Sequence, residues 1–440
     1  WWFRLTGGKP ELTSLDFLRD IPLATFVVRD QPRLRDLGAL AAMPLVTVDL
    51  RGCGVRDLVA VARPTLRWLD IARTPIADLA LLAGSSLEAL DISESAVVSL
   101  VPLRGVPLKQ LTANACVAIA DLGPLRGMPL EALVMATAND QNGGAVSDLA
   151  ALAGCPLKHL DLRGARALSD LGALRGMPLE KLLLDDTAVK SLVPLKGSRL
   201  KRLGLTRTAV TDLTALAGVP LEQLDFSPER LANGLPTLRA MRTLSRINGT
   251  AVGDFWATAG VHDALVKRNP EYRWEAKLVS EATKVVEIEG RALGLRDLAP
   301  LTGHPLRRVW LPDNPVTTLD PLTAAPIEVI NLSGTGVRSI TWASRLPLTK
   351  LLLSRTEVTD LEPLANRARL AVLHIDDTGV VDLRPLMLLQ LEELVFTPKN
   401  IRAGAERIRQ MKTLRRLGTA GDKLQPADEF WQAWDKGAYK

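Results

Sequence analysis

Aromatic residues are scarce in this chain: they make up 4% of 440 residues and include two tyrosines, although 47% of the residues are hydrophobic. Any core must therefore be built mainly from Leu, Val, Ile and Ala, which suits thin repeated layers. No uncharged apolar run approaches the roughly 18–20 residues that span a bilayer, so the sequence predicts no membrane insertion. Disorder is disfavoured as well, because the chain is hydrophobic and its formal net charge is only +6.

Cysteine and excess charge are also in short supply. Cys53, Cys116 and Cys155 are too dispersed for a disulfide framework and are compatible with a reducing compartment such as the cytoplasm. The 55 Lys and Arg exceed the 49 Asp and Glu so narrowly that nucleic-acid binding is allowed but not indicated. The opening WWFRLTGGKP begins at Trp1 and lacks the pattern of a secretory signal, so we expect a fragment or a processed piece.

The first ten units of the chain follow one another in steps of 21 or 22 residues, apart from one step of 27, and a second series of six units follows them. Each unit reads roughly P-L-x-x-L-x-L-x-x-T-x-V-x-D-L-x-x-L-x-G, as in PLEKLLLDDTAVKSLVPLKG at 178–197. A period of this length indicates a solenoid. Sixteen units begin, in order, at Leu23, Leu45, Leu66, Leu87, Leu108, Leu130, Leu157, Leu179, Leu200, Leu221, Thr283, Leu306, Ile327, Leu348, Leu370 and Leu391.

Each part of the repeat predicts a local structure. In L-x-x-L-x-L the last two leucines alternate with polar residues, which predicts a short strand with one buried face. In V-x-D-L-x-x-L the Asp is placed to cap a short helical or 3₁₀ turn whose leucines pack inward. The Gly and Pro that follow end this turn and lead the chain into the next strand.

A small polar side chain follows each strand. We expect it to hydrogen-bond backbone groups of its own coil and of the next coil, because no sheet ladder reaches them. The residues in this slot include Thr74, Thr187, Thr208, Thr335, Thr356 and Thr378, with Cys53 and Asn314 in the same place.

These features together resemble the leucine-rich repeat in its short bacterial form, over nearly the whole chain. The resemblance implies an α/β repeat solenoid with a parallel sheet on its concave side. A doubly wound sheet is the alternative, but 21 residues are too few for a strand, a full helix and two loops.

The repeat stops twice, and it stops the same way. Residues 226–246 match residues 396–416 at one constant spacing, as Phe226-Ser-Pro matches Phe396-Thr-Pro. The sequence therefore predicts a tandem duplication with a first array at 1–276 and a second array at 277–440. Each array should end in a capping helix, at about 227–276 and 397–440, entered through Ser227-Pro228 or Thr397-Pro398.

This terminator and the segment NPEYRW at 269–274 look like those of leucine-rich repeat regions in planctomycete-type bacterial proteins. In that family such regions often accompany serine/threonine protein kinase domains. The resemblance implies a recognition or scaffolding part of a larger bacterial signalling protein.

The sequence offers no enzyme, metal or cofactor site. Neither a Gly-rich phosphate loop, nor the kinase H-R-D and D-F-G motifs, nor a G-x-S-x-G elbow is present. The four histidines are scattered without ligand spacing, which predicts surface positions for them. Any kinase activity would lie outside this chain.

Residues between the strand leucines point outward and define a candidate binding face. In the first array an acidic row with aromatic anchors suits a basic peptide or protein; the alternative is that Asp is simply tolerated in solvent. The second array offers Trp310, either as a binding hot spot or packed against a neighbouring unit. The candidate residues are Asp49, Arg51, Trp68, Asp70, Asp91, His159, Asp161, Arg163 and Asp225 in the first array, and Arg308 and Trp310 in the second.

The step of 27 residues adds about five residues within ATANDQNGGAVS at 136–147. They belong either to the binding surface or to a tolerated surface insertion. The leading hypothesis is a non-catalytic protein-interaction module that binds a protein or peptide on its concave face. The alternatives are the sensory or substrate-selecting region of a larger kinase, and a binder of nucleic acid or another anionic surface, which the acidic row argues against.

Overall fold

The computed structural model describes residues 1–6, 12–137 and 143–439. The chain divides into two compact units, Trp1–Gly249 and Thr250–Lys440. Each unit is built from successive coils of the chain.

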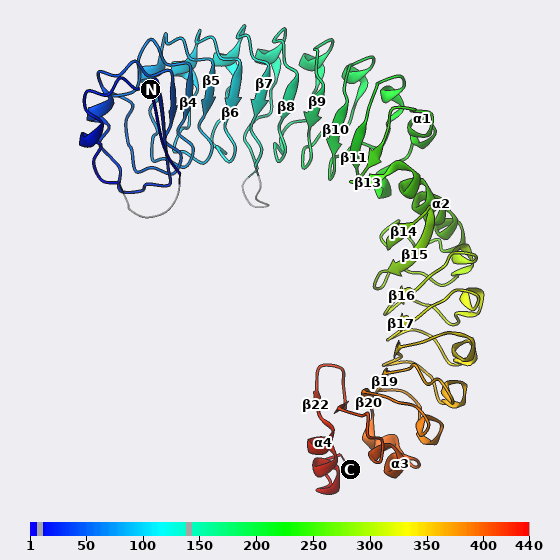
Figure 1. Cartoon of the computed structure of the whole chain (residues 1–440). Helices are drawn as coiled ribbons and strands as arrows, with labels where there is room; N and C mark the ends of the chain where they lie inside the picture. The colour runs from blue at the N-terminus through cyan, green and yellow to red at the C-terminus, as the bar shows by residue number, and fades with distance from the viewer. Residues whose placement is uncertain (7–11, 138–142, 440) are drawn as a thin grey trace. The chain divides into compact units, whose positions relative to one another are not determined.

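The strands of the first unit lie side by side in chain order, each parallel to the next (Figure 1). Most have three residues, because a coil of 21 or 22 residues must also hold a turn and two connections. These strands are β1 (Trp2–Thr6), β2 (Thr25–Arg29), β3 (Thr47–Asp49), β4 (Trp68–Asp70), β5 (Ala89–Asp91), β6 (Gln110–Thr112), β7 (Ala132–Val134), β8 (His159–Asp161), β9 (Lys181–Leu183), β10 (Arg202–Leu205), β11 (Gln223–Phe226) and β12 (Arg246–Ile247).

The other side of most coils holds a 3₁₀ turn, which begins two residues after the repeat Asp or a Ser in its place. Asp78, for example, accepts a hydrogen bond on Oδ1 from the N–H of Ala80, at 2.7 Å. Asp78 therefore forms an Asx turn that leads into the 3₁₀ turn, whereas the predicted position as its N-cap is taken by Leu79. The turns of the first unit are η1 (Asp16–Leu18), η2 (Gly38–Leu40), η3 (Ala80–Leu82), η4 (Val101–Leu103), η5 (Gly123–Leu125), η6 (Ala150–Leu152), η7 (Gly172–Leu174), η8 (Val193–Leu195), η9 (Thr214–Leu216) and η10 (Pro228–Arg230), and the helix α1 (Leu235–Arg239) follows them.

The repeat leucines form the core between the strands and the 3₁₀ turns. In the coil that contains β4, Leu66, Leu69 and Ile71 are fully buried from the strand side, and Ile76 and Leu82 from the turn side. Each coil fills the same places with the same side chains, so apolar burial is uniform along the array and supplies most of its stability.

The polar slot after each strand is buried and hydrogen-bonded within its own coil. Thr74 donates from Oγ1 to the carbonyl oxygen of Ile71 at 2.7 Å, and the other threonines of this slot make the same bond. Asn314 and Cys53 instead reach the preceding coil, where they bond the carbonyls of Gly290 and Val28. The expected bonds to a following coil are replaced by bonds to the preceding one.

The second unit begins with the two-residue strand β13 and a helix, continues through an antiparallel hairpin and a series of parallel strands, and ends in a second antiparallel pair. Its strands are β13 (Thr250–Ala251), β14 (Lys277–Glu281), β15 (Lys284–Glu289), β16 (Arg308–Trp310), β17 (Val329–Asn331), β18 (Lys350–Leu352), β19 (Val372–Ile375), β20 (Glu393–Phe396), β21 (Arg416–Gly418) and β22 (Leu424–Pro426). Its helices and 3₁₀ turns are α2 (Val252–Arg268), η11 (Ala299–Leu301), η12 (Asp320–Leu322), η13 (Thr341–Arg345), η14 (Glu362–Leu364), η15 (Arg384–Leu386), η16 (Pro398–Asn400), α3 (Ala405–Arg409) and α4 (Ala427–Asp435).

The division between the units lies at Gly249, earlier than the boundary that we predicted near residue 276. The difference comes from α2, which we had assigned to the end of the first array. Val261 and Leu265 of this helix, with Tyr272 after it, belong to the apolar core of the second unit. The segment therefore opens the second array.

The sequence predicts that a helix begins after Ser227 and after Thr397, and this prediction is wrong. A 3₁₀ turn follows each, and neither hydroxyl caps it. Instead, Ser227 Oγ accepts a hydrogen bond from the N–H of Arg207, and Thr397 Oγ1 accepts one from the N–H of Asp377. Both hydroxyls tie the last coil to the coil before it.

Candidate functional site

Equal register between neighbouring strands places outward residues of the first unit in rows across the sheet. One row, which we call the outer row, runs in strand order through Trp2, Thr25, Thr47, Trp68, Ala89, Gln110, Ala132, His159, Lys181, Arg202, Gln223 and Arg246. The parallel row, which we call the inner row, carries the predicted acidic residues Asp49, Asp70, Asp91, Asp161 and Asp225.

Most inner-row carboxylates are buried and ion-paired, so the predicted solvent-facing acidic surface is wrong. Asp49 and Asp70 are 1% and 2% exposed. Asp49 accepts a hydrogen bond from Arg29 Nε at 2.7 Å, and Asp70 accepts one from Arg51 Nε at 3.2 Å. Arg51 also reaches Asp91 with Nη2 at 3.0 Å. The arginines neutralise the negative charges of these three carboxylates through contacts inside the unit.

Each of these carboxylates also closes the turn after its own strand. Asp70 accepts a hydrogen bond on Oδ1 from the N–H of Ala72, and Asp91 does the same for Ser93. Asp161 is 2% exposed and is bonded to both the N–H and the guanidinium of Arg163. The row is therefore mainly structural. Burial raises the pKa of Asp70, and the negative charges of Asp91 and Asp49 add to this effect.

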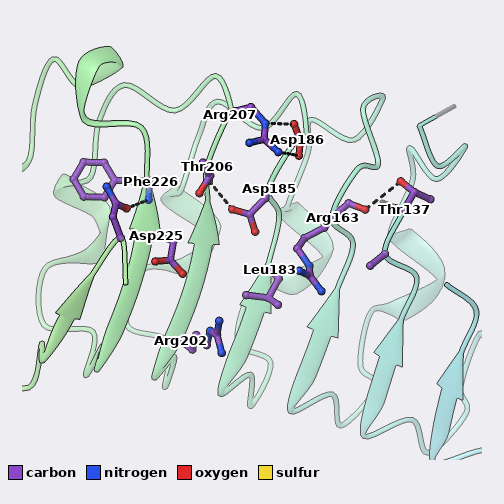
Figure 2. A pocket seen from close by; sticks show the side chains of 12 residues that line it. Thr137, Arg163, Leu183, Asp185, Asp186, Arg202, Thr206, Arg207, Asp225 and Phe226 are labelled. Carbon is purple, nitrogen blue, oxygen red and sulfur yellow. Dashed lines mark hydrogen bonds and ion pairs between the residues drawn. The ribbon is translucent and has the colours of Figure 1, made fainter. Parts of the chain in front are cut away.

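Asp225 is the exception in the acidic row. It is half-buried, and within the described residues its carboxylate has neither a hydrogen bond nor an ion pair. It lines a hollow of about 710 Å³ at the end of the first strand face (Figure 2). The hollow also contains Arg202, Thr206 and Leu183, together with Asp185, whose Oδ1 accepts a hydrogen bond from the N–H of Thr206 at 2.8 Å.

Two unpaired cations of the outer row lie beside this hollow. Arg202, which lines it, is exposed, Lys181 is half-buried, and neither makes an ion pair with any described residue. His159 stands next to Lys181 in the same row, and its Nε2 is buried without a hydrogen-bond partner in the described part of the chain. Burial lowers the pKa of His159, and the charge of Lys181 lowers it further. Sequence reasoning missed Arg202, although it holds the same strand position as Lys181.

Trp68 lies at the opposite end of the first strand face. It lines a second hollow, of about 820 Å³, with Trp2. The two tryptophans share the outer row, with Thr25 and Thr47 between them. The structure therefore brings the predicted aromatic residue Trp68 together with Trp2, and separates both from His159.

In the second unit the predicted residues Arg308 and Trp310 lie together on β16. The Arg308 guanidinium carbon lies 4.6 Å from the centroid of the Trp310 ring, and Lys350 Nζ of β18 lies 5.8 Å from it. Trp310 thus supports two cations in cation–π contacts.

The last coils of the second unit hold a buried polar cluster. His374 Nε2 lies 2.6 Å from Oε1 of Glu393, whose other carboxylate oxygen pairs with Arg416. His374 and His262 are 9% and 8% exposed, so the prediction of surface positions is wrong for these two histidines. His262 lies on α2, where its Nδ1 bonds the hydroxyl of Tyr272.

Among the described residues there is no cluster of His, Cys, Asp and Glu that could hold a metal ion, and no helix long and apolar enough to cross a membrane. Of the inserted segment at 136–147, residues 138–142 lie outside the described residues. Thr137 of this segment lines the hollow near Asp225, and its Oγ1 donates to the carbonyl of Arg163.

No family model matches the sequence, and no curated protein matches it either. Solved structures do. An internalin of Listeria monocytogenes is 15% identical over 84% of each chain, with a TM-score of 0.27. A leucine-rich repeat protein of Leptospira interrogans is 13% identical over 92% of this chain and 99% of its own, with a TM-score of 0.35. These proteins are similar to this chain in the repeat fold alone.

Proposed function

We propose that this chain is a non-catalytic protein-interaction module that binds a protein or peptide partner on the strand face of its first array. The proposed contact residues are those that internal contacts leave free, namely Asp225, Lys181 and Arg202, with His159 beside them.

The unused charge on this face is the observation that supports the proposal. Asp49, Asp70 and Asp161 are buried and paired with arginines, so they stabilise the coils. Lys181 and Arg202 have no such partner within the described residues. Charged groups that serve no internal contact and lie beside a hollow are available to a ligand, and a polar rim of this kind contributes chiefly specificity and association rate. The same role fits a recognition region with or without an accompanying kinase domain.

The test is partner capture from a lysate of the source organism, with the immobilised chain as bait. We expect a set of proteins that Arg202→Glu no longer captures and that Lys196→Glu still captures, because Lys196 is an exposed lysine at the end of η8, across the coil from the strands. Equal capture by the Arg202 variant and the unmodified chain would refute the proposed face.

A further inference from the structure

The duplication lets each array be compared with the other at its last coils. By sequence spacing and strand register, Gly204, Gln223 and Asp225 of the first array correspond to His374, Glu393 and Val395 of the second. Lys181 corresponds to Lys350 by strand register. The two arrays therefore carry the same surface position with different side chains and different surroundings.

The last strands of the second array are covered at this position, whereas those of the first array border a hollow. His374, Glu393 and Val395 are 9%, 5% and 0% exposed. Their counterparts Gln223 and Asp225 are half-buried, and Gly204 lies between Leu183 and Asp225, two residues that line the hollow of about 710 Å³. In the first array Gly204 is buried beside Asp185 and Leu183, and the hollow lies next to it at Asp225.

Part of the cover in the second array is a longer hairpin. The segment from Arg416 to Phe430 is five residues longer than the corresponding segment from Arg246 to Phe255. Its loop, residues 419–423, joins β21 to β22 and passes over His374: a Cβ on Gly421 would lie 3.4 Å from the imidazole Cε1 and Nδ1. In the first array β12 is followed instead by the short turn Asn248-Gly249.

The chemistry of the open hollow fits a polypeptide with an acidic side chain. Arg202 and Lys181 are cations without ion-pair partners among the described residues, so they attract a carboxylate. Asp225 and Asp185 are acceptors that a backbone N–H can reach. A sugar-phosphate backbone has no N–H group to donate to these two carboxylates, which favours a polypeptide here.

We propose that this hollow is a docking site for an extended acidic segment of a partner protein, which takes the place that residues 419–423 take in the second array. This inference rests on the proposed function and names its partner class. The acidic side chain meets Arg202 and Lys181, and backbone N–H groups of the segment meet Asp225.

The probe is a fluorescein-labelled octaglutamate peptide, and its binding to the whole chain is followed by fluorescence anisotropy at low salt. We expect saturable binding that weakens as salt rises, and about a tenfold or greater rise in Kd for Lys181→Glu and for Arg202→Glu. Lys350→Glu is the matched control, since it makes the same charge change at the corresponding position of the second array and should leave Kd within about twofold.

A loop graft tests the comparison between the arrays directly. Replacing residues 248–249 with residues 418–423 should close the hollow and abolish octaglutamate binding, whereas a Gly-Ser linker of the same length should preserve it. Circular dichroism establishes that both grafts fold. Should the graft leave binding intact, or should octaglutamate fail to bind the unmodified chain, the docking site is overturned.

The outcome separates this inference from the broader one. If partner capture depends on Arg202 but octaglutamate does not bind, the proposed interaction face is supported and the proposed acidic segment is refuted. Tighter, Arg202-dependent binding of a single-stranded oligothymidylate than of octaglutamate would reassign the hollow to nucleic acid.

Discussion

His374 occupies in the second array the position that Gly204 occupies in the first. The imidazole bonds Glu393 and lies beneath the loop that contains Gly421, whereas Gly204 has no side chain and is buried beside Asp185 and Leu183. A Cβ at Gly204 would approach Asp185 Oδ2 to 2.5 Å, so a larger side chain fits there only if Asp185 moves. Two copies of one structural unit thus differ at the place where binding is proposed.

Arg51 should stabilise the first array through the two carboxylates that it joins. Replacing it with Met keeps the apolar stem but leaves Asp70 and Asp91 without their cation. We expect a loss of about 1–2 kcal/mol at pH 7, less than for a fully buried pair because Arg51 is partly solvated. The loss should shrink as the pH falls and Asp70, whose pKa is already raised, becomes protonated.

Urea unfolding at pH 7 and pH 4 measures this effect. Arg56→Met is the control, because Arg56 is exposed and pairs with no described residue. An Arg51 effect that is equal at both pH values would argue against the ion-pair explanation.

His262 should make the second unit sensitive to acid. Burial lowers its pKa to about 4 from an ordinary value of 6.5. The unfolded chain therefore binds a proton that the folded chain does not, so stability is full above pH 6.5 and falls as the pH drops toward 4. Over that window the loss is about 3 kcal/mol.

The variant His262→Asn tests this, since Asn retains an acceptor for the Tyr272 hydroxyl without a titrating group. The difference in unfolding free energy between pH 7 and pH 4.5 should be smaller in the variant. A His262 ring that titrates near its ordinary pKa by NMR would contradict the prediction.

The three cysteines should be unreactive in the folded chain. All three are buried, and burial raises the pKa of Cys53 to about 11 and shifts Cys116 and Cys155 in the same direction. Since the thiolate is the reactive form, Ellman's reagent should label none of them at pH 7 and all three in denaturant. Rapid labelling of one cysteine in the native chain would show that its coil opens.

Phe430 should hold the end of the second array. It is fully buried and contacts the rings of Phe396, Trp434 and Tyr439. We expect Phe430→Ala to cost about 3–5 kcal/mol of unfolding free energy. Val193→Ala, at a 60% exposed site, should change it by no more than about 0.5 kcal/mol. Denaturant unfolding compares the two variants, and similar losses would refute a capping role.

The sequence was sufficient to predict the coil, because each coil repeats one local pattern. The strand leucines, the Asx turn at Asp78 and the buried hydroxyl of Thr74 all follow from spacing within about ten residues. The boundary at Gly249 did not follow, because the core contacts of Leu265 on α2 depend on tertiary packing that the sequence pattern of a helix does not specify.

The acidic row was misjudged for a related reason. Alternation along a strand tells which face a side chain occupies, but not whether a neighbouring coil covers it. The missing signal was available: Arg29 precedes Asp49, and Arg51 precedes Asp70, by about one repeat, which places each guanidinium beside the next carboxylate. When the charged residues that form such pairs are set aside, Arg202 and Lys181 remain as cations without a partner among the described residues.

The longer hairpin at 419–423 makes the surface at the end of the second array different from the surface at the end of the first. The five additional residues of this connection place a loop over His374 in the second array, while the last strands beneath it keep the register of their counterparts in the first array. The length of the loop at the end of an array can therefore determine whether the last strands are covered or accessible.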